Sequence, residues 1–163
     1  MKKKIILSAT VILLAALTAA VVFFMPKKTG NGGDPSFETL VIETRSGAKH
    51  SFEIEVADTP QKQAIGLMYR KQMDADHGML FLMSREPKET AFWMKNTYIP
   101  LDMLFIGADG RIEHIRENTV PLDLTPVPSG VPVTAVLELN GGRTAALGIA
   151  EGDRVIHYYF QNK

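Results

Sequence analysis

The feature that most limits what this chain can fold into is a long apolar run near its N-terminal end. Three lysines precede 21 mostly apolar residues, Ile5 to Met25. A helix of that length reaches roughly 31 Å, the thickness of a bilayer core. We therefore expect residues 1–25 to be a membrane anchor. The alternative is a cleaved signal segment ending near Ala20, although the apolar residues 21–24 that follow favour the anchor.

The flanks of this run predict where the rest of the chain lies. The lysines at positions 2–4 favour a cytoplasmic N-terminus. The protein would then be a single-pass protein of the cytoplasmic membrane with its domain on the extracytoplasmic (periplasmic) side, or secreted if the segment is cleaved. Residues 26–36 are rich in glycine, proline and polar residues and predict a flexible linker. Residues 37–163 remain to form a globular domain.

Charge and cysteine content exclude several function classes. Residues 37–163 carry 13 basic and 17 acidic side chains, a net charge of about −4 (13 − 17). A mildly acidic domain without a basic stripe binds the phosphates of nucleic acid poorly, so we expect no nucleic-acid partner. The chain has no cysteine, which excludes a disulfide framework, a thiolate zinc site and a cysteine nucleophile.

Hydrophobic periodicity predicts a mainly β domain. Residues 51–57 alternate, with Phe52, Ile54 and Val56 on one face and polar side chains on the other, which indicates an antiparallel hairpin with residues 38–44. Short apolar runs at residues 78–83, 91–95, 101–106 and 133–139 predict further strands, and the chain ends in another at residues 154–160. The expected fold is an antiparallel β-sandwich or partly closed barrel, jelly-roll-like, plus the N-terminal anchor helix.

Two short helices and one long loop interrupt these strands. Asp58-Thr59-Pro60 is a helix start, and the helix should reach about Tyr69. Asn140 can cap a second helix over residues 141–147. Residues 118–132 contain four prolines and predict a loop of the length that often contacts a partner.

Several separated blocks of sequence resemble one protein family. They are AFWMKNTYIPLDMLFI at residues 91–106, GLMYR at 66–70, GMLF at 78–81 and VLELN at 136–140. Together they resemble the domain of unknown function 192 family of bacteria and archaea over roughly residues 38–160. Gly141-Gly142 departs from the more usual Ala-Gly of that family. The resemblance implies a jelly-roll-like sandwich, often behind an export signal or anchor, and it implies no activity and no catalytic residue.

The first candidate site lies around a charged residue in an apolar strand. Asp102 sits in a run that is apolar on both faces, and burying a carboxylate is costly unless it is paired. Lys95 and Asn96 are its nearest candidate partners across the turn at Pro100. Two interpretations follow. Lys95 and Asp102 form a structural ion pair while Asn96 fixes the turn, or these three residues form the base of a polar ligand pocket.

Three more residues are candidates for the same pocket. Glu138 and Asn140 share the polar face of their strand, and Glu138 could act with Asp102 as an acid–base pair. Glu138 could instead form a buried ion pair, for example with Arg70. Trp93, the only tryptophan, either stacks on a ligand or belongs to the core.

Metal sites receive little support from the sequence. Thioethers can bind Cu(I), but methionine is also a common filler of irregular cores. The four histidines lack zinc-ligand spacing, and no phosphate-binding loop is present, so we expect no cofactor and no zinc site. The methionines concerned are Met68, Met73, Met79, Met83, Met94 and Met103.

These patterns leave three hypotheses for function. The first is a binding or interaction module of the cell envelope that contacts an envelope protein or a small polar ligand and has no enzymatic activity. The second is a hydrolase of an envelope polymer that uses Asp102 and Glu138. The third is a copper carrier that uses methionines.

Overall fold

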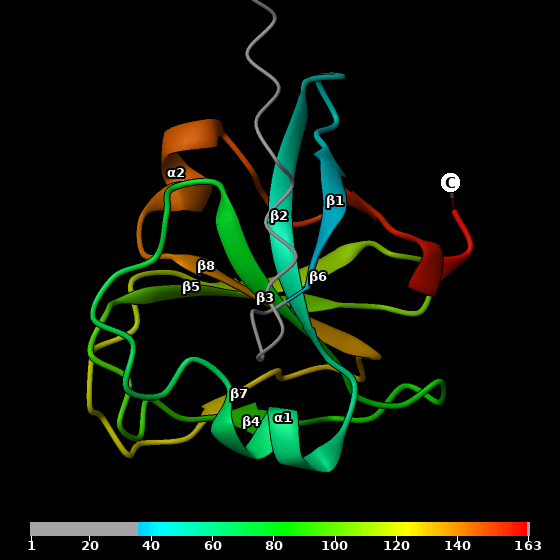
Figure 1. The fold of residues 1–163 in the computed structure, drawn as a ribbon. Helices are drawn as coiled ribbons and strands as arrows, with labels where there is room; N and C mark the ends of the chain where they lie inside the picture. The colour runs from blue at the N-terminus through cyan, green and yellow to red at the C-terminus, as the bar shows by residue number, and fades with distance from the viewer. Residues whose placement is uncertain (1–35, 163) are drawn as a thin grey trace, which may run out of the picture. The chain divides into compact units, whose positions relative to one another are not determined.

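The computed structural model describes residues 36–162, and the predicted anchor and most of the predicted linker lie outside them. Within these residues no helix is long and apolar enough to span a membrane. The prediction of a mainly β domain with two short helices is confirmed (Figure 1). The elements are β1 Phe37–Glu43, β2 Lys49–Ala57, α1 Pro60–Ile65, β3 His77–Leu82, β4 Ala91–Phe92, β5 Leu101–Ile106, β6 Ile112–Arg116, β7 Val127–Pro128, β8 Ala135–Asn140, α2 Arg143–Leu147, β9 Arg154–Ile156 and a 3₁₀ turn at Tyr158–Phe160.

Seven strands form one sheet in the order β6-β5-β8-β3-β2-β1-β9. Neighbouring strands are antiparallel, as expected, except that β2 and β3 are parallel. The exception arises because α1 and the segment after it carry the chain back to the start of β2 before β3 begins, as a crossover connection requires.

The two edges of this sheet meet and nearly close it into a barrel. Arg111, just before β6, and Arg154 of β9 form a β-bridge. Ile112 N–H donates to the Asp153 carbonyl at 3.0 Å, and Val155 N–H donates to the Gly110 carbonyl at 2.8 Å. Closure removes the unpaired edges that would otherwise invite pairing with other chains.

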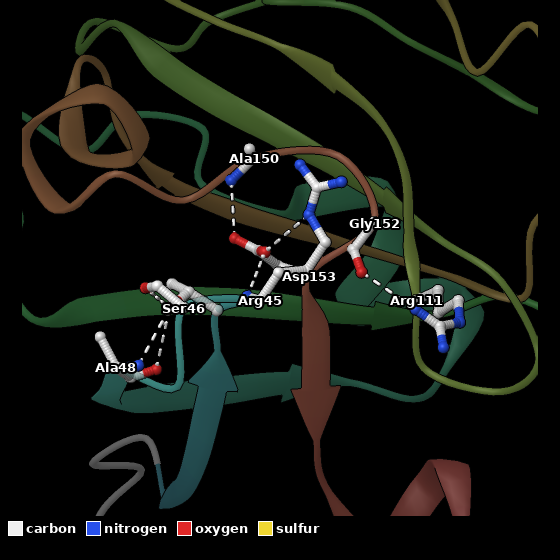
Figure 2. Close-up of polar contacts among 8 residues, drawn as sticks. Arg45, Ser46, Ala48, Arg111, Ala150, Gly152 and Asp153 are labelled. Atoms are coloured by element: carbon white, nitrogen blue, oxygen red, sulfur yellow. Dashed lines mark hydrogen bonds and ion pairs between the residues drawn. The ribbon is translucent and has the colours of Figure 1, made fainter.

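A buried aspartate fixes the turns beside this seam (Figure 2). The Asp153 side chain is 3% exposed. One carboxylate oxygen accepts the Arg45 N–H at 2.9 Å, and the other accepts the Ala150 N–H at 2.8 Å. The side chain therefore joins the β1–β2 turn to the segment that leads into β9.

The core consists of two apolar clusters on opposite faces of the sheet. Leu80, Leu104 and Leu137 belong to the first cluster, which fills the inside of the barrel. Phe81, Phe105 and Val136 alternate with them along β3, β5 and β8 and belong to the second. The helix α1, the β4–β7 pair and their loops lie at the end of the molecule where this second face is covered (Figure 1).

Several predicted element boundaries are wrong. The predicted strand 91–95 pairs only at Ala91–Phe92, and its partner β7 comes from the predicted loop 118–132. That loop is not free, because Leu122 N–H donates to the Thr97 carbonyl at 3.1 Å and Met94 N–H donates to the Asp123 carbonyl at 2.9 Å. The last strand ends at Ile156, and a 3₁₀ turn follows at Tyr158–Phe160.

The first helix also ends earlier than predicted. It stops at Ile65 because Gly66 adopts φ 49°, and a Cβ there would lie 3.0 Å from the Phe81 ring. The turn therefore requires glycine both for its backbone conformation and for its close approach to the sheet.

Candidate functional site

Asp102 is a structural residue that organises α2. It is fully buried in β5, and four donors satisfy its carboxylate. One oxygen accepts the N–H groups of Asn118 and Gly142, each at 2.9 Å. The other accepts the N–H and the hydroxyl of Thr144, at 2.9 and 2.7 Å. The carboxylate therefore does for α2 what an N-terminal cap does, although it comes from a distant strand.

The predicted Lys95–Asp102 ion pair does not occur among the described residues. The chain leaves β4 after Phe92, so Lys95 is not opposite Asp102 on a paired strand. The Lys95 ammonium instead lies over the Trp93 ring, 5.2 Å from its centroid, which is a cation–π contact.

Asn96 and Asn140 each hold a loop in place. Asn96 adopts φ 54°, and its side-chain amide donates to the Tyr69 hydroxyl at 2.9 Å. The Asn140 amide donates to the carbonyls of Met73 and Asp74, at 3.1 and 2.8 Å. The predicted role of Asn140 as a helix cap is wrong, because Gly142 precedes α2 without a side-chain bond and Asp102 binds the free N–H groups.

Glu138 and Asp102 cannot act together as an acid–base pair. In the β5–β8 register Asp102 lies opposite Leu139, whereas Glu138 lies opposite Met103. Paired residues point to the same side of a sheet and successive residues point to opposite sides. The two carboxyl groups therefore lie on opposite faces, and the sequence-based hydrolase hypothesis is wrong.

The alternative Glu138–Arg70 ion pair is also wrong. Both terminal nitrogens of Arg70 bind the carboxylate of Glu55. Glu138 is 4% exposed, and within residues 36–162 no hydrogen bond or ion pair satisfies its side chain. Burial alone raises the pKa of the Glu138 carboxyl from 4.5 to about 8, so this group is protonated at neutral pH.

Glu138 lines a small cavity beneath α1, which we name the glutamate cavity. Its volume is about 50 Å³, enough for a water molecule or a single polar head group. The residues around it are 63–68 of α1 and the following turn, together with Phe81, Phe92, Trp93, Lys95, Thr97 and Glu138. Three of the predicted site residues, Trp93, Lys95 and Glu138, therefore come together here.

A larger apolar hollow, which we name the aromatic cleft, adjoins the glutamate cavity. Its volume is about 360 Å³, and it is lined by Gln63, Phe81, Met83, Ala91, Phe92, Trp93 and Pro126. Four of these residues, Gln63, Phe81, Phe92 and Trp93, line both spaces. Trp93 is 52% exposed, so its ring is accessible to a ligand. Apolar walls with one convergent polar group are typical of a small-molecule site.

Sequence reasoning missed most of this site because no local pattern marks it. Gln63 lies on a helix with no buried residue, and its amide donates to the carbonyls of Ala57 and Leu82, at 3.1 and 2.7 Å. The cleft exists only because α1 and β4 lie beside the same face of the sheet, and no spacing in the sequence encodes that contact.

The methionines serve mainly as core residues. Met79, Met94 and Met103 are buried in the second apolar cluster, and Met73 packs against it. No group of histidine, aspartate and glutamate side chains within residues 36–162 could hold a metal ion.

Within residues 36–162 the fold is therefore a nearly closed β barrel in which the buried Glu138 carboxyl lies beside an aromatic cleft. Residues 41–157 match the family model DUF192, described as Uncharacterized ACR, and the chain belongs to this family. A comparison with curated proteins found no match.

Two solved structures are similar to the domain. A protein from Sinorhizobium meliloti 1021, described as a "putative transcription regulator", is 44% identical with a TM-score of 0.75, and the match covers 78% of this chain and 98% of that one. A protein of unknown function from Novosphingobium aromaticivorans DSM 12444 is 45% identical with a TM-score of 0.70, covering 74% of this chain and 85% of that one. The first relative consists almost entirely of the matched region, and in this chain residues 36–162 belong to one compact unit.

Asp102→Asn should destabilise the domain strongly. The amide keeps one acceptor oxygen and turns an NH₂ group toward buried donors, so we expect a loss of about 3 kcal/mol or more in the free energy of unfolding. Urea denaturation of residues 36–163 measures it. The exposed variant Asp74→Asn is the control and should change stability by less than about 0.5 kcal/mol. Equal stabilities of the two variants would contradict a structural role.

Glu138→Gln should stabilise the domain, increasingly so as the pH rises. The carboxyl ionises near pH 4.5 in the unfolded chain and near 8 in the folded one, so between these values only the folded state retains the proton. Wild-type stability then falls by about 1.4 kcal/mol per pH unit across this window. We expect Glu138→Gln to match wild type near pH 4 and to exceed it by on the order of 4 kcal/mol near pH 8.

The measurement is urea denaturation at several pH values. Glu89→Gln, at an exposed position, is the matched control and should show no growing difference from wild type. A stability difference for Glu138→Gln that does not depend on pH would refute the raised pKa.

Proposed function

We propose that this protein is a binding module of the cell envelope, held at the extracytoplasmic face of the cytoplasmic membrane by residues 5–25, and that its aromatic cleft binds a small amphipathic ligand. The observation that carries the proposal is the Glu138 carboxyl, which is buried without a partner at a cavity that adjoins an apolar cleft. Folding alone does not favour such a group, because the same space filled by an apolar side chain would cost less.

The accessible Trp93 ring supports the same proposal. A half-exposed tryptophan beside a 360 Å³ hollow provides a flat apolar surface against which a ligand can stack. The N-terminal apolar run, which is long enough to cross a bilayer, supports the envelope location.

The Sinorhizobium relative is described as a "putative transcription regulator", and for this chain a role in binding DNA receives less support. The two helices of the described domain have six and five residues, too short to serve as a recognition helix in a major groove. Residues 37–163 also carry a net charge of about −4 (13 − 17). Phosphate contacts, which supply most of the affinity for DNA, need the opposite charge.

Binding in the aromatic cleft should be visible in the emission of Trp93. We expect 2-phenylethanol, a neutral molecule of suitable size, to change this emission saturably with a dissociation constant of roughly 1 mM. Ala91→Phe places a ring inside the cleft and should weaken binding by about tenfold or more. The control Ala108→Phe changes an exposed turn residue and should bind as wild type does. A linear, non-saturating response would refute the cleft as a binding site.

The membrane location is tested with the full chain. We expect it to remain in the membrane fraction after an alkaline carbonate wash and to need detergent for release, because about 20 apolar residues anchor it. A variant lacking residues 1–35 should be soluble. Recovery of a soluble mature form that begins near Val21 would replace the anchor with the cleaved signal segment.

A further inference from the structure

We propose that the ligand carries a primary ammonium group on an apolar body, and that this ammonium enters the glutamate cavity and pairs with Glu138 while the body occupies the aromatic cleft. This inference rests on the proposed function, because it names the class of ligand that the same cleft takes.

The buried carboxyl is the first argument. Glu138 lies on β8 between Met79 of β3 and Met103 of β5, its partners in the two ladders, and both are buried thioethers. No donor or cation within residues 36–162 reaches the carboxyl. A group in this position gains most from a ligand that supplies both a positive charge and N–H donors, because such a pair in an apolar setting is short and strong.

The aromatic walls are the second argument. Phe81, Phe92 and Trp93 line both the cavity and the cleft, and the negative face of an aromatic ring attracts cations. The molecule already shows this attraction, since the ammonium of Lys95 rests over the Trp93 ring at 5.2 Å from its centroid. Lys95 also lines the cavity that we assign to the ligand ammonium, without contacting the Glu138 carboxyl.

The sizes of the two spaces define the rest of the ligand. A cavity of about 50 Å³ accepts a single ammonium head but not a sugar or a nucleotide. A cleft of about 360 Å³ accepts an apolar body of drug-fragment size. Free amines and lysine side chains share this chemistry, so both belong among the test compounds.

The charges around Glu138 allow a sharp test. Lys95 is the other charged side chain that lines the cavity, and the neighbouring strands contribute the uncharged Met79 and Met103 at this position. An ammonium ligand binds the ionised carboxyl, so at neutral pH its binding must expel the proton of Glu138 to the buffer. A ligand that accepts a hydrogen bond would instead need that proton to stay.

The experiment compares four ligands of residues 36–163: 2-phenylethylamine, 2-phenylethanol, phenylacetate and Nα-acetyl-lysine amide. Their binding is measured from the emission of Trp93 at pH 6.5 and 8.5. With a Glu138 pKa of about 8, the amine should bind about 25-fold tighter at pH 8.5 than at pH 6.5, because the ionised fraction of the carboxyl rises by that factor. The alcohol should show no pH dependence, and phenylacetate should bind more weakly than the alcohol at both values. Calorimetry at pH 7 in buffers of different ionisation enthalpy should show close to one proton released per amine bound.

Two variants complete the design. Glu138→Gln keeps the size of the side chain and should abolish both the pH dependence of amine binding and the proton release. Glu53→Gln, which changes an exposed carboxylate, should leave all affinities unchanged. If acetyl-lysine amide binds with the same pH dependence, the ammonium group comes from a lysine side chain of a protein. If the free amine alone binds, the ammonium group belongs to a small molecule.

The outcomes separate the two proposals. If the alcohol binds and the amine binds no tighter than the alcohol at pH 8.5, the ammonium class is wrong and the cleft remains a binding site. Tighter binding of phenylacetate than of the amine would likewise overturn the ammonium class. If no compound changes the Trp93 emission saturably, both proposals fail.

Discussion

The structure depends on the burial of both faces of three central strands. β3, β8 and β5 present one set of apolar residues to the inside of the barrel and the alternate set to a second cluster outside it. The other elements either close the barrel, as β9 and β6 do, or cover the outer face. With both faces largely covered, a carboxyl on these strands is costly to ionise unless buried donors satisfy it.

Asp102 and Glu138 illustrate the two possibilities on adjacent strands. Asp102 points to the face where α2 and the segment at Asn118 supply four donors, and it stays fully buried. Glu138 points to the other face, where its strand neighbours are methionines, and burial raises its pKa to about 8. The first carboxyl stabilises the fold, whereas the second costs stability at neutral pH. Groups that cost stability are where a functional role is most reasonably sought.

The cover of the outer face is thin where Glu138 lies. α1 has no buried residue, and the β4–β7 pair is two residues long on each strand. Such a cover leaves space between itself and the sheet, and the aromatic cleft and the glutamate cavity occupy that space.

Alternation and turn residues are local signals, so the sequence alone predicts the β class and the two helix positions. Its separated motif blocks also indicate the family, and its apolar strands visibly contain carboxyl side chains. It also brought Trp93, Lys95 and Glu138 forward as candidates. Three features could be learned from the three-dimensional fold alone: Asp102 and Glu138 face opposite ways, Lys95 contacts Trp93, and α1 forms one wall of the cleft. These outcomes depend on contacts between residues far apart in the chain and on strand register. A shift of the register by one residue would move every side chain of the strand to the other face of the sheet.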